Sequence, residues 1–162
     1  KGGEVPRAPG MKYKHYSPRA RVVLFEGGKP REGKGEGKGM MEGIELEGKT
    51  VGVIRTVRWE VAAGLRHGNP GEVAGEVKDA KTELVVRKGA LLAEDGTTET
   101  GTLLDVDLGK DIKGVAHGLF AALRELDRLG ADVILVEGVG DGDDMAAAVM
   151  NRLRKAASEI RV

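Results

Sequence analysis

The 162-residue chain has no cysteine, which excludes disulfides, thiolate zinc sites and a cysteine nucleophile. It has only two serines, Ser17 and Ser158, and neither stands in the pattern of a nucleophile elbow. The three histidines, His15, His67 and His117, show no metal-ligand spacing. No apolar run approaches the roughly 20 residues of a transmembrane helix, so we expect no contact with membranes. We therefore predict no catalytic residue, no metal site and no resident cofactor in this chain.

The 26 basic residues balance the 26 acidic ones, which argues against direct DNA binding. The balance is uneven, because residues 1–43 hold ten Lys or Arg against five Asp or Glu. This basic arm is either a solvated tail or a segment that touches something anionic. The chain begins with Lys1, and we expect it to be a fragment or a processed product.

The first half of the chain contains strand-like segments between glycine-rich stretches. We predict an extended linker over residues 1–20 and a domain over 21–162, with a flexible glycine-rich loop at 27–43. β-Branched and apolar residues predict strands at 21–26, 50–55 and 82–87, the last of them ended by Gly89, and a marginal strand at 103–108. A short helix is expected at 58–66, ended by Pro70 and Gly71.

The C-terminal third has the clearest patterns. Apolar residues at helical spacing predict an amphipathic helix over 116–129, and Gly130 suits its C′ position. The nearly all-apolar segment 132–137 predicts a strand covered on both faces. A final helix is expected from about 144 to 158, capped by Asp143, with its apolar face formed by Met145, Val149, Leu153 and Ala156. This alternation predicts an α/β fold: a small Rossmann-like three-layer domain with a mostly parallel sheet.

Two glycine motifs could bind phosphate. Gly43 to Thr50 matches the phosphate-loop pattern letter for letter, but the residues after Lys49 favour a strand rather than the required helix. We interpret that match as fortuitous and expect Lys49 at the entry to a strand. Gly138, Gly140 and Gly142 lie between a strand and a helix, and form a possible anion-binding turn. Neighbouring aspartates favour a tight turn there instead, because phosphate would need a divalent metal beside them.

The linker is the most informative segment. Both tyrosines of the chain, Tyr13 and Tyr16, lie within Pro9–Pro18, interleaved with Lys12, Lys14 and His15. Tyrosine rings can stack on a base and lysines can pair with phosphates, so this segment is a candidate nucleotide contact.

The segment Ala8-Pro-Gly-Met-Lys-Tyr-Lys-His-Tyr-Ser-Pro18 resembles the interdomain linker of long, two-domain L-threonylcarbamoyladenylate synthases. The segments 119–127, 132–137 and 149–157 resemble the C-terminal domain of the same family. The resemblance implies a cytoplasmic parent enzyme that condenses L-threonine, bicarbonate and ATP, with magnesium, to threonylcarbamoyl-AMP and pyrophosphate for tRNA modification. It also implies that chemistry belongs to a YrdC-type domain that this chain lacks. The linker would cross the mouth of that domain's pocket, with nucleotide contacts from Lys12, Tyr13, His15 and Tyr16.

The sequence departs from the family at two places. It has Asp144-Met-Ala146 where the family usually has Gly-x-Gly before the final helix, which weakens any nucleotide site in this domain. The loop 27–43 looks like an insertion. We expect an accessory or lid domain that is inactive by itself. The alternatives are a stand-alone nucleotide-binding or hydrolysing Rossmann-like domain, and a protein-interaction module.

Overall fold

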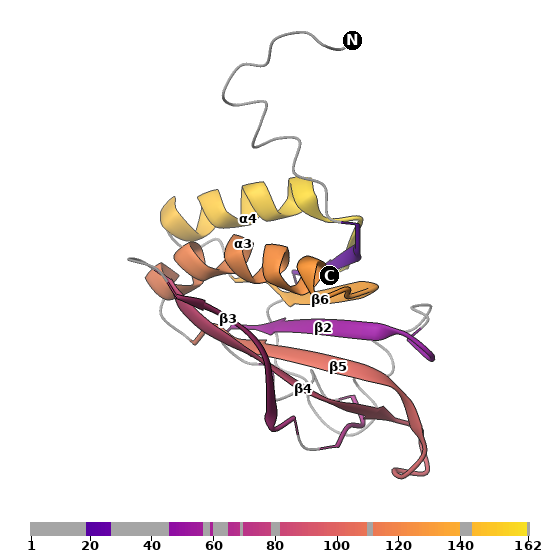
Figure 1. Cartoon of the computed structure of the whole chain (residues 1–162). Coiled ribbons are helices and arrows are strands. Elements are labelled where there is room, and N and C mark those ends of the chain that lie inside the picture. The colour runs from indigo at the N-terminus through magenta and orange to yellow at the C-terminus, as the bar shows by residue number, and fades with distance from the viewer. Residues whose placement is uncertain are drawn as a thin grey trace, which may run out of the picture.

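The computed structural model describes residues 19–26, 46–56, 59, 65–68, 70–78, 82–109, 112–139 and 144–161. These residues form one seven-stranded sheet with two helices, α3 (Ile112–Arg128) and α4 (Asp144–Ala156). Both helices lie side by side over one face of the sheet (Figure 1). Residues 1–18 of the expected linker, the whole of the expected loop 27–43 and most of the helix expected at 58–66 lie outside the described residues.

The strands are β1 (Arg21–Phe25), β2 (Thr50–Arg55), β3 (Glu72–Lys78), β4 (Glu83–Leu92), β5 (Glu99–Asp107), β6 (Val133–Glu137) and β7 (Glu159–Arg161). Their order across the sheet is β3-β4-β5-β2-β6-β1-β7. β5, β2, β6, β1 and β7 run parallel, whereas β4 is antiparallel to both β3 and β5. The prediction of an α/β fold with a mostly parallel sheet is therefore confirmed.

The central strands are buried on both faces, as their apolar sequences predicted. On the helix face, side chains of β1, β2, β5 and β6 pack against α3 and α4 around residues such as Ile54, Ile134, Leu123, Leu126 and Leu153. On the opposite face, a second core contains Val53, Leu103, Leu135 and Trp59, with Leu46 and Leu65 packed against it. Both cores exclude water from the sheet and hold its strands together.

Two glycines have clear structural reasons. A Cβ on Gly52 of β2 would lie 2.8 Å from Leu126 Cδ1, so glycine here lets α3 approach the sheet closely. Gly130 adopts φ of 92° just after α3, which confirms the predicted C′ glycine.

Several element predictions were wrong in detail. β4 continues past Gly89 to Leu92, and β5 begins at Glu99 and is well buried rather than marginal. β3 and β7 were not predicted. The buried face of α4 consists of Ala146, Val149, Met150 and Leu153, whereas Met145 is 41% exposed. The expected register was therefore right at Val149 and Leu153 and wrong at Met145.

Candidate functional site

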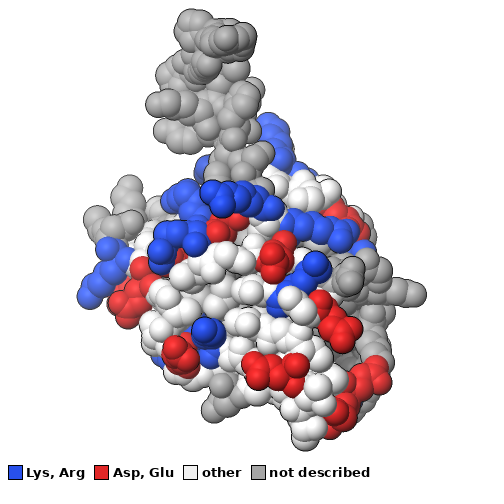
Figure 2. All heavy atoms as spheres, turned by 45° about the vertical axis from the view of Figure 1, so that its right-hand side comes forward, with Lys and Arg blue, Asp and Glu red and all other residues white. Residues whose placement is uncertain are grey.

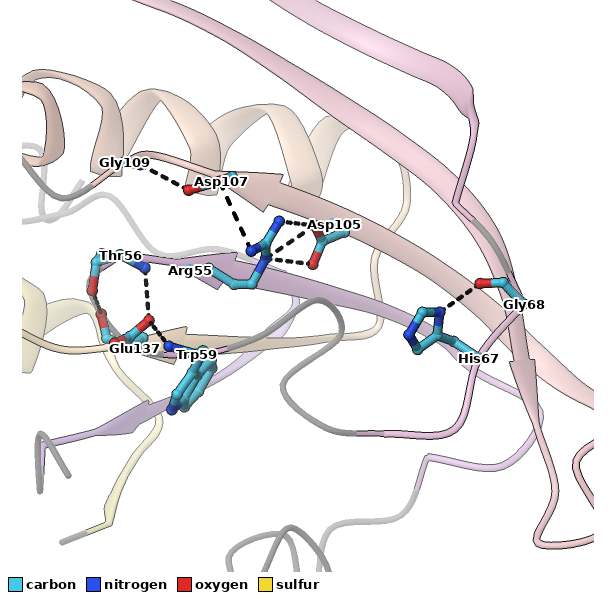
Figure 3. Close-up of polar contacts among 9 residues, drawn as sticks. All are labelled: Arg55, Thr56, Trp59, His67, Gly68, Asp105, Asp107, Gly109 and Glu137. Carbon is cyan, nitrogen blue, oxygen red and sulfur yellow. Dashed lines mark hydrogen bonds and ion pairs between the residues drawn. The ribbon is translucent and has the colours of Figure 1, made fainter. Parts of the chain in front are cut away.

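The carboxyl ends of β2, β5 and β6 bring four charged residues to one edge of the sheet. The Arg55 guanidinium donates to the Asp105 carboxylate from Nε at 3.1 Å and from Nη2 at 2.8 Å. Asp107 lies 3.8 Å from Nη1 of the same arginine (Figure 3). Asp105 is only 5% exposed, so pairing with Arg55 offsets the cost of burying its charge. The pair fastens the ends of two adjacent parallel strands.

Glu137, the last residue of β6, is 3% exposed and closes the same edge. Its Oε1 accepts hydrogen bonds from the backbone N–H groups of Thr56 at 2.7 Å and Trp59 at 3.1 Å (Figure 3). The Trp59 ring then packs edge-on against Phe25, with ring centroids 5.4 Å apart. Dinucleotide-binding folds place phosphate at such a carboxyl edge, on backbone N–H donors. In this domain, the Glu137 carboxylate already accepts from the two N–H groups at this edge, those of Thr56 and Trp59.

The possible anion-binding turn begins at Gly138. Its first two residues, Gly138 and Val139, contact the neighbouring residues Phe25 and Met150. The Gly138 N–H donates to the Phe25 carbonyl at 3.0 Å, and a Cβ on Gly138 would lie 3.0 Å from Met150 Cε. The Val139 N–H points to the Met150 sulfur at 3.4 Å. The N–H groups of Gly138 and Val139 therefore already have partners within the domain. Whether the whole segment forms a tight turn or an anion site stays a prediction. Gly140 and Gly142 lie outside the described residues.

Lys49 lies immediately before β2, as predicted, and does not begin a helix. Its N–H donates to the Leu46 carbonyl at 3.1 Å across a turn in which Gly48 has φ of 77°. Residues 46–49 therefore form a turn into a strand. The geometry that a phosphate loop requires is not formed around Lys49.

The amino edge of the sheet carries a second set of carboxylate contacts, which we call the amino-edge clamp: Asp127 and Asp132 with their backbone partners. Asp127 Oδ2 accepts from the Arg19 N–H at 3.2 Å, and Oδ1 accepts from the Ala20 N–H at 3.0 Å. Asp132 Oδ2 accepts from the Thr50 N–H at 2.9 Å. The clamp thus joins the end of α3 to the start of β1, and the turn before β6 to the start of β2.

The remaining residues singled out from the sequence have ordinary structural surroundings. His117 is an exposed residue within α3, further from the helix start than expected, and its carbonyl accepts from the Thr82 hydroxyl at 3.1 Å. His67 contacts the Gly68 carbonyl through Nδ1. The Ser158 hydroxyl lies 3.1 Å from the Val22 N–H, to which it is an acceptor. Among the described residues, no group of three or more His, Asp or Glu side chains could hold a metal ion.

The four predicted nucleotide contacts, Lys12, Tyr13, His15 and Tyr16, lie outside the described residues. Sequence reasoning missed the roles of Glu137 and Asp127. Glu137 had one usable signal, since an acid at the end of a fully apolar strand must find donors. Asp127 had another signal, since the helix dipole disfavours a carboxylate near a helix C-terminus, and such a carboxylate therefore needs stabilising hydrogen-bond donors. Neither described helix has the length and apolar character needed to cross a lipid bilayer.

Residues 1–158 match the family model described as "Threonylcarbamoyl-AMP synthase, C-terminal domain". The chain is 34% identical over 158 residues to the threonylcarbamoyl-AMP synthase of Pyrococcus abyssi, covering 97% of this chain and 34% of that protein. It is 30% identical to the Schizosaccharomyces pombe threonylcarbamoyl-AMP synthase, covering 96% of this chain and 30% of that protein.

The crystal structure of P. abyssi Sua5 complexed with L-threonine is similar in fold, with a TM-score of 0.50 and 32% sequence identity. That match covers 98% of this chain and 35% of the solved one. The chain therefore spans about a third of the length of these relatives. On this similarity along almost its whole length, the chain belongs to the family of threonylcarbamoyl-AMP synthase C-terminal domains.

Proposed function

We propose that this chain acts as the accessory and lid part of a cytoplasmic threonylcarbamoyl-AMP synthase. Residues 21–162 would form the domain, and residues 1–20 the linker that the domain presents to a YrdC-type catalytic domain of the same polypeptide. The catalytic domain would bind ATP, magnesium, L-threonine and bicarbonate. The observation that carries the proposal is the family match from residue 1, which includes the linker together with the domain.

The chemistry of the linker suits contact with a nucleotide. Tyr13 or Tyr16 would contact the nucleotide by ring or hydroxyl, Lys12 or Lys14 would supply positive charge, and His15 would add a further contact. Threonylcarbamoyl-AMP is a labile mixed anhydride, so a lid that excludes water would protect it from hydrolysis. The domain itself contributes little to nucleotide binding in this proposal, because Glu137 already accepts from the Thr56 and Trp59 N–H groups at the carboxyl edge.

The test uses the full-length synthase that contains this chain and measures pyrophosphate release that depends on ATP and threonine. We expect Lys12→Ala and Tyr16→Ala each to lower synthesis about 10- to 150-fold, the equivalent of losing one charge-assisted contact. Lys113→Ala is the matched control, because Lys113 is an exposed lysine on α3. The control and both variants should keep the wild-type melting temperature.

Wild-type rates in both linker variants would contradict the lid proposal and favour a protein-interaction module. Binding of ATP to the 162-residue chain alone, measured by calorimetry, would instead favour the stand-alone nucleotide-binding domain.

A further inference from the structure

The carboxylate of Asp127 sits where helix electrostatics disfavours it. Asp127 is the penultimate residue of α3, and the C-terminal end of a helix carries partial negative charge that repels a carboxylate. The neighbouring acid Glu125 pairs with Arg128, with Nη2 and Oε2 2.6 Å apart. Asp127 instead faces the N–H groups of Arg19 and Ala20, at 3.2 and 3.0 Å. The stabilising partners of Asp127 are therefore the backbone of the segment that leads into β1.

The residues held by Asp127 are the last ones before the sheet. Ala20 is 3% exposed and belongs to the helix-face core. Directly after it, the Arg21 N–H donates to the Asp132 carbonyl at 2.9 Å, and β1 begins. The chain is thus fixed to the domain from Arg19 onward. Tyr16 is three residues away, which is at most about 10 Å of extended chain.

We propose that Asp127 is a positioning residue for the linker. By accepting from two consecutive N–H groups, it sets the point and the direction in which residues 1–18 leave the domain. In the full-length enzyme, this fixed exit point would limit the region that Tyr16 and its neighbours can reach. This inference rests on the proposed function, because it matters to synthesis only if the linker meets the nucleotide.

The same clamp supplies a control that separates linker positioning from general stability. Asp132 lies five residues further along the chain, and its carboxylate also accepts one backbone N–H, that of Thr50 at 2.9 Å. Thr50 begins β2, on the other side of β6 from β1. Removing the Asp132 carboxylate therefore weakens the amino edge of the sheet without removing a side-chain contact to Arg19 or Ala20.

The experiment compares Asp127→Ala, Asp127→Asn and Asp132→Ala in the full-length synthase. Hydrogen exchange of the Arg19 and Ala20 amides should be at least about tenfold faster in Asp127→Ala, because two charge-assisted bonds are lost. The KM for ATP should rise about tenfold while kcat changes less. Part of the free energy of ATP binding would then be used to order the linker, which weakens the observed binding. Asp127→Asn keeps one acceptor oxygen and should be intermediate. Asp132→Ala should lower the melting temperature but leave the KM for ATP unchanged.

Two results would overturn the inference. One is wild-type exchange of the Arg19 and Ala20 amides in Asp127→Ala. The other is the same change in KM for ATP in Asp127→Ala and Asp132→Ala, which would assign Asp127 a purely structural role. The proposed function fails separately, through wild-type synthesis in Lys12→Ala and Tyr16→Ala. If those two variants are impaired while Asp127→Ala has a wild-type KM for ATP, only the positioning role is lost.

Discussion

Replacing Glu137 tests whether its carboxylate stabilises the carboxyl edge of the sheet by accepting hydrogen bonds from the Thr56 and Trp59 backbone N–H groups. Glu137 is 3% exposed, and its Oε1 accepts hydrogen bonds from the backbone N–H groups of both Thr56 and Trp59. Glu137→Ala leaves two backbone N–H groups without this acceptor. Each such group costs about 1–3 kcal/mol when buried, so the substitution should lower the free energy of unfolding by about 2–6 kcal/mol.

Glu137→Gln separates the charge from the hydrogen bonds. A glutamine carbonyl oxygen can occupy the position of Oε1 and accept from both N–H groups. At these two bonds the extra strength of a charged acceptor is lost, about 1 kcal/mol for each, so together they should account for a loss of about 2 kcal/mol or less. The alanine variant should also loosen Trp59, whose ring packs on Phe25.

Urea unfolding followed by tryptophan fluorescence measures both effects, because Trp59 is the one tryptophan of the chain. The midpoints should fall in the order wild type, glutamine, alanine, at a similar dependence on urea. An alanine variant within about 0.5 kcal/mol of wild type would refute the reasoning, since surface substitutions have effects of that size. It would mean that water satisfies the Thr56 and Trp59 N–H groups equally well.

Three further predictions concern other parts of the domain. Gly114→Ala in α3 should stabilise the domain by about 0.5–1 kcal/mol, because the new Cβ would meet only the Leu108 carbonyl oxygen, at 3.6 Å. Gly101→Ala should destabilise the domain by about 2 kcal/mol or more, because its Cβ would lie 2.4 Å from the Lys49 carbonyl oxygen. Thermal unfolding of both variants and the wild type measures these effects. The Thr98 hydroxyl and the N–H groups of Thr98 and Thr97 lower the pKa of Asp95 from 3.8 to about 2; its stabilising effect should be complete above pH 4 and disappear toward pH 2, and Thr98→Val should raise that pKa in an NMR titration. Lys49→Ala should leave ATP affinity unchanged by calorimetry, and a loss of binding would restore the phosphate-loop interpretation.

The sequence predicted the central elements of the fold because their burial dictates their composition. The strands β1, β2 and β6 are covered on both faces, so their segments consist largely of β-branched and apolar residues. The long helix α3 shows apolar residues at helical spacing because only one side of it meets the sheet. Elements in the middle of the molecule therefore carry patterns that can be recognised locally.

The missed strands lie at the edges of the sheet, where packing places fewer constraints on the residue types of a strand. β3 is an edge strand with exposed Glu72, Glu76 and Lys78, and β7 has only three residues. Gly89 was misinterpreted as the end of β4. Its Cβ would lie 2.9 Å from Pro70 Cα, so this glycine marks a close approach of the backbone inside a strand.

The contacts of the candidate site could not be predicted because they join distant parts of the sequence. Glu137 contacts Thr56 across 81 positions, and Asp127 contacts Ala20 across 107. A sequence pattern can indicate that an acid near a helix end or a strand end needs donors. Only the topology decides which backbone N–H groups lie there, because the neighbours in this sheet come from opposite ends of the chain.

The same type of contact occurs at both edges of the sheet, but it holds different parts of the chain. At each edge a carboxylate accepts from two backbone N–H groups, an arrangement that resembles the binding of a phosphate by backbone amides. At the carboxyl edge, Glu137 holds Thr56 and Trp59, both of which belong to the body of the domain. At the amino edge, Asp127 holds Arg19 and Ala20, which lead out of it. The Glu137 bonds are buried, so loss of Glu137 should mainly lower the free energy of unfolding. The Asp127 bonds are exposed or part-buried, so loss of Asp127 should cost less stability and should raise the KM for ATP.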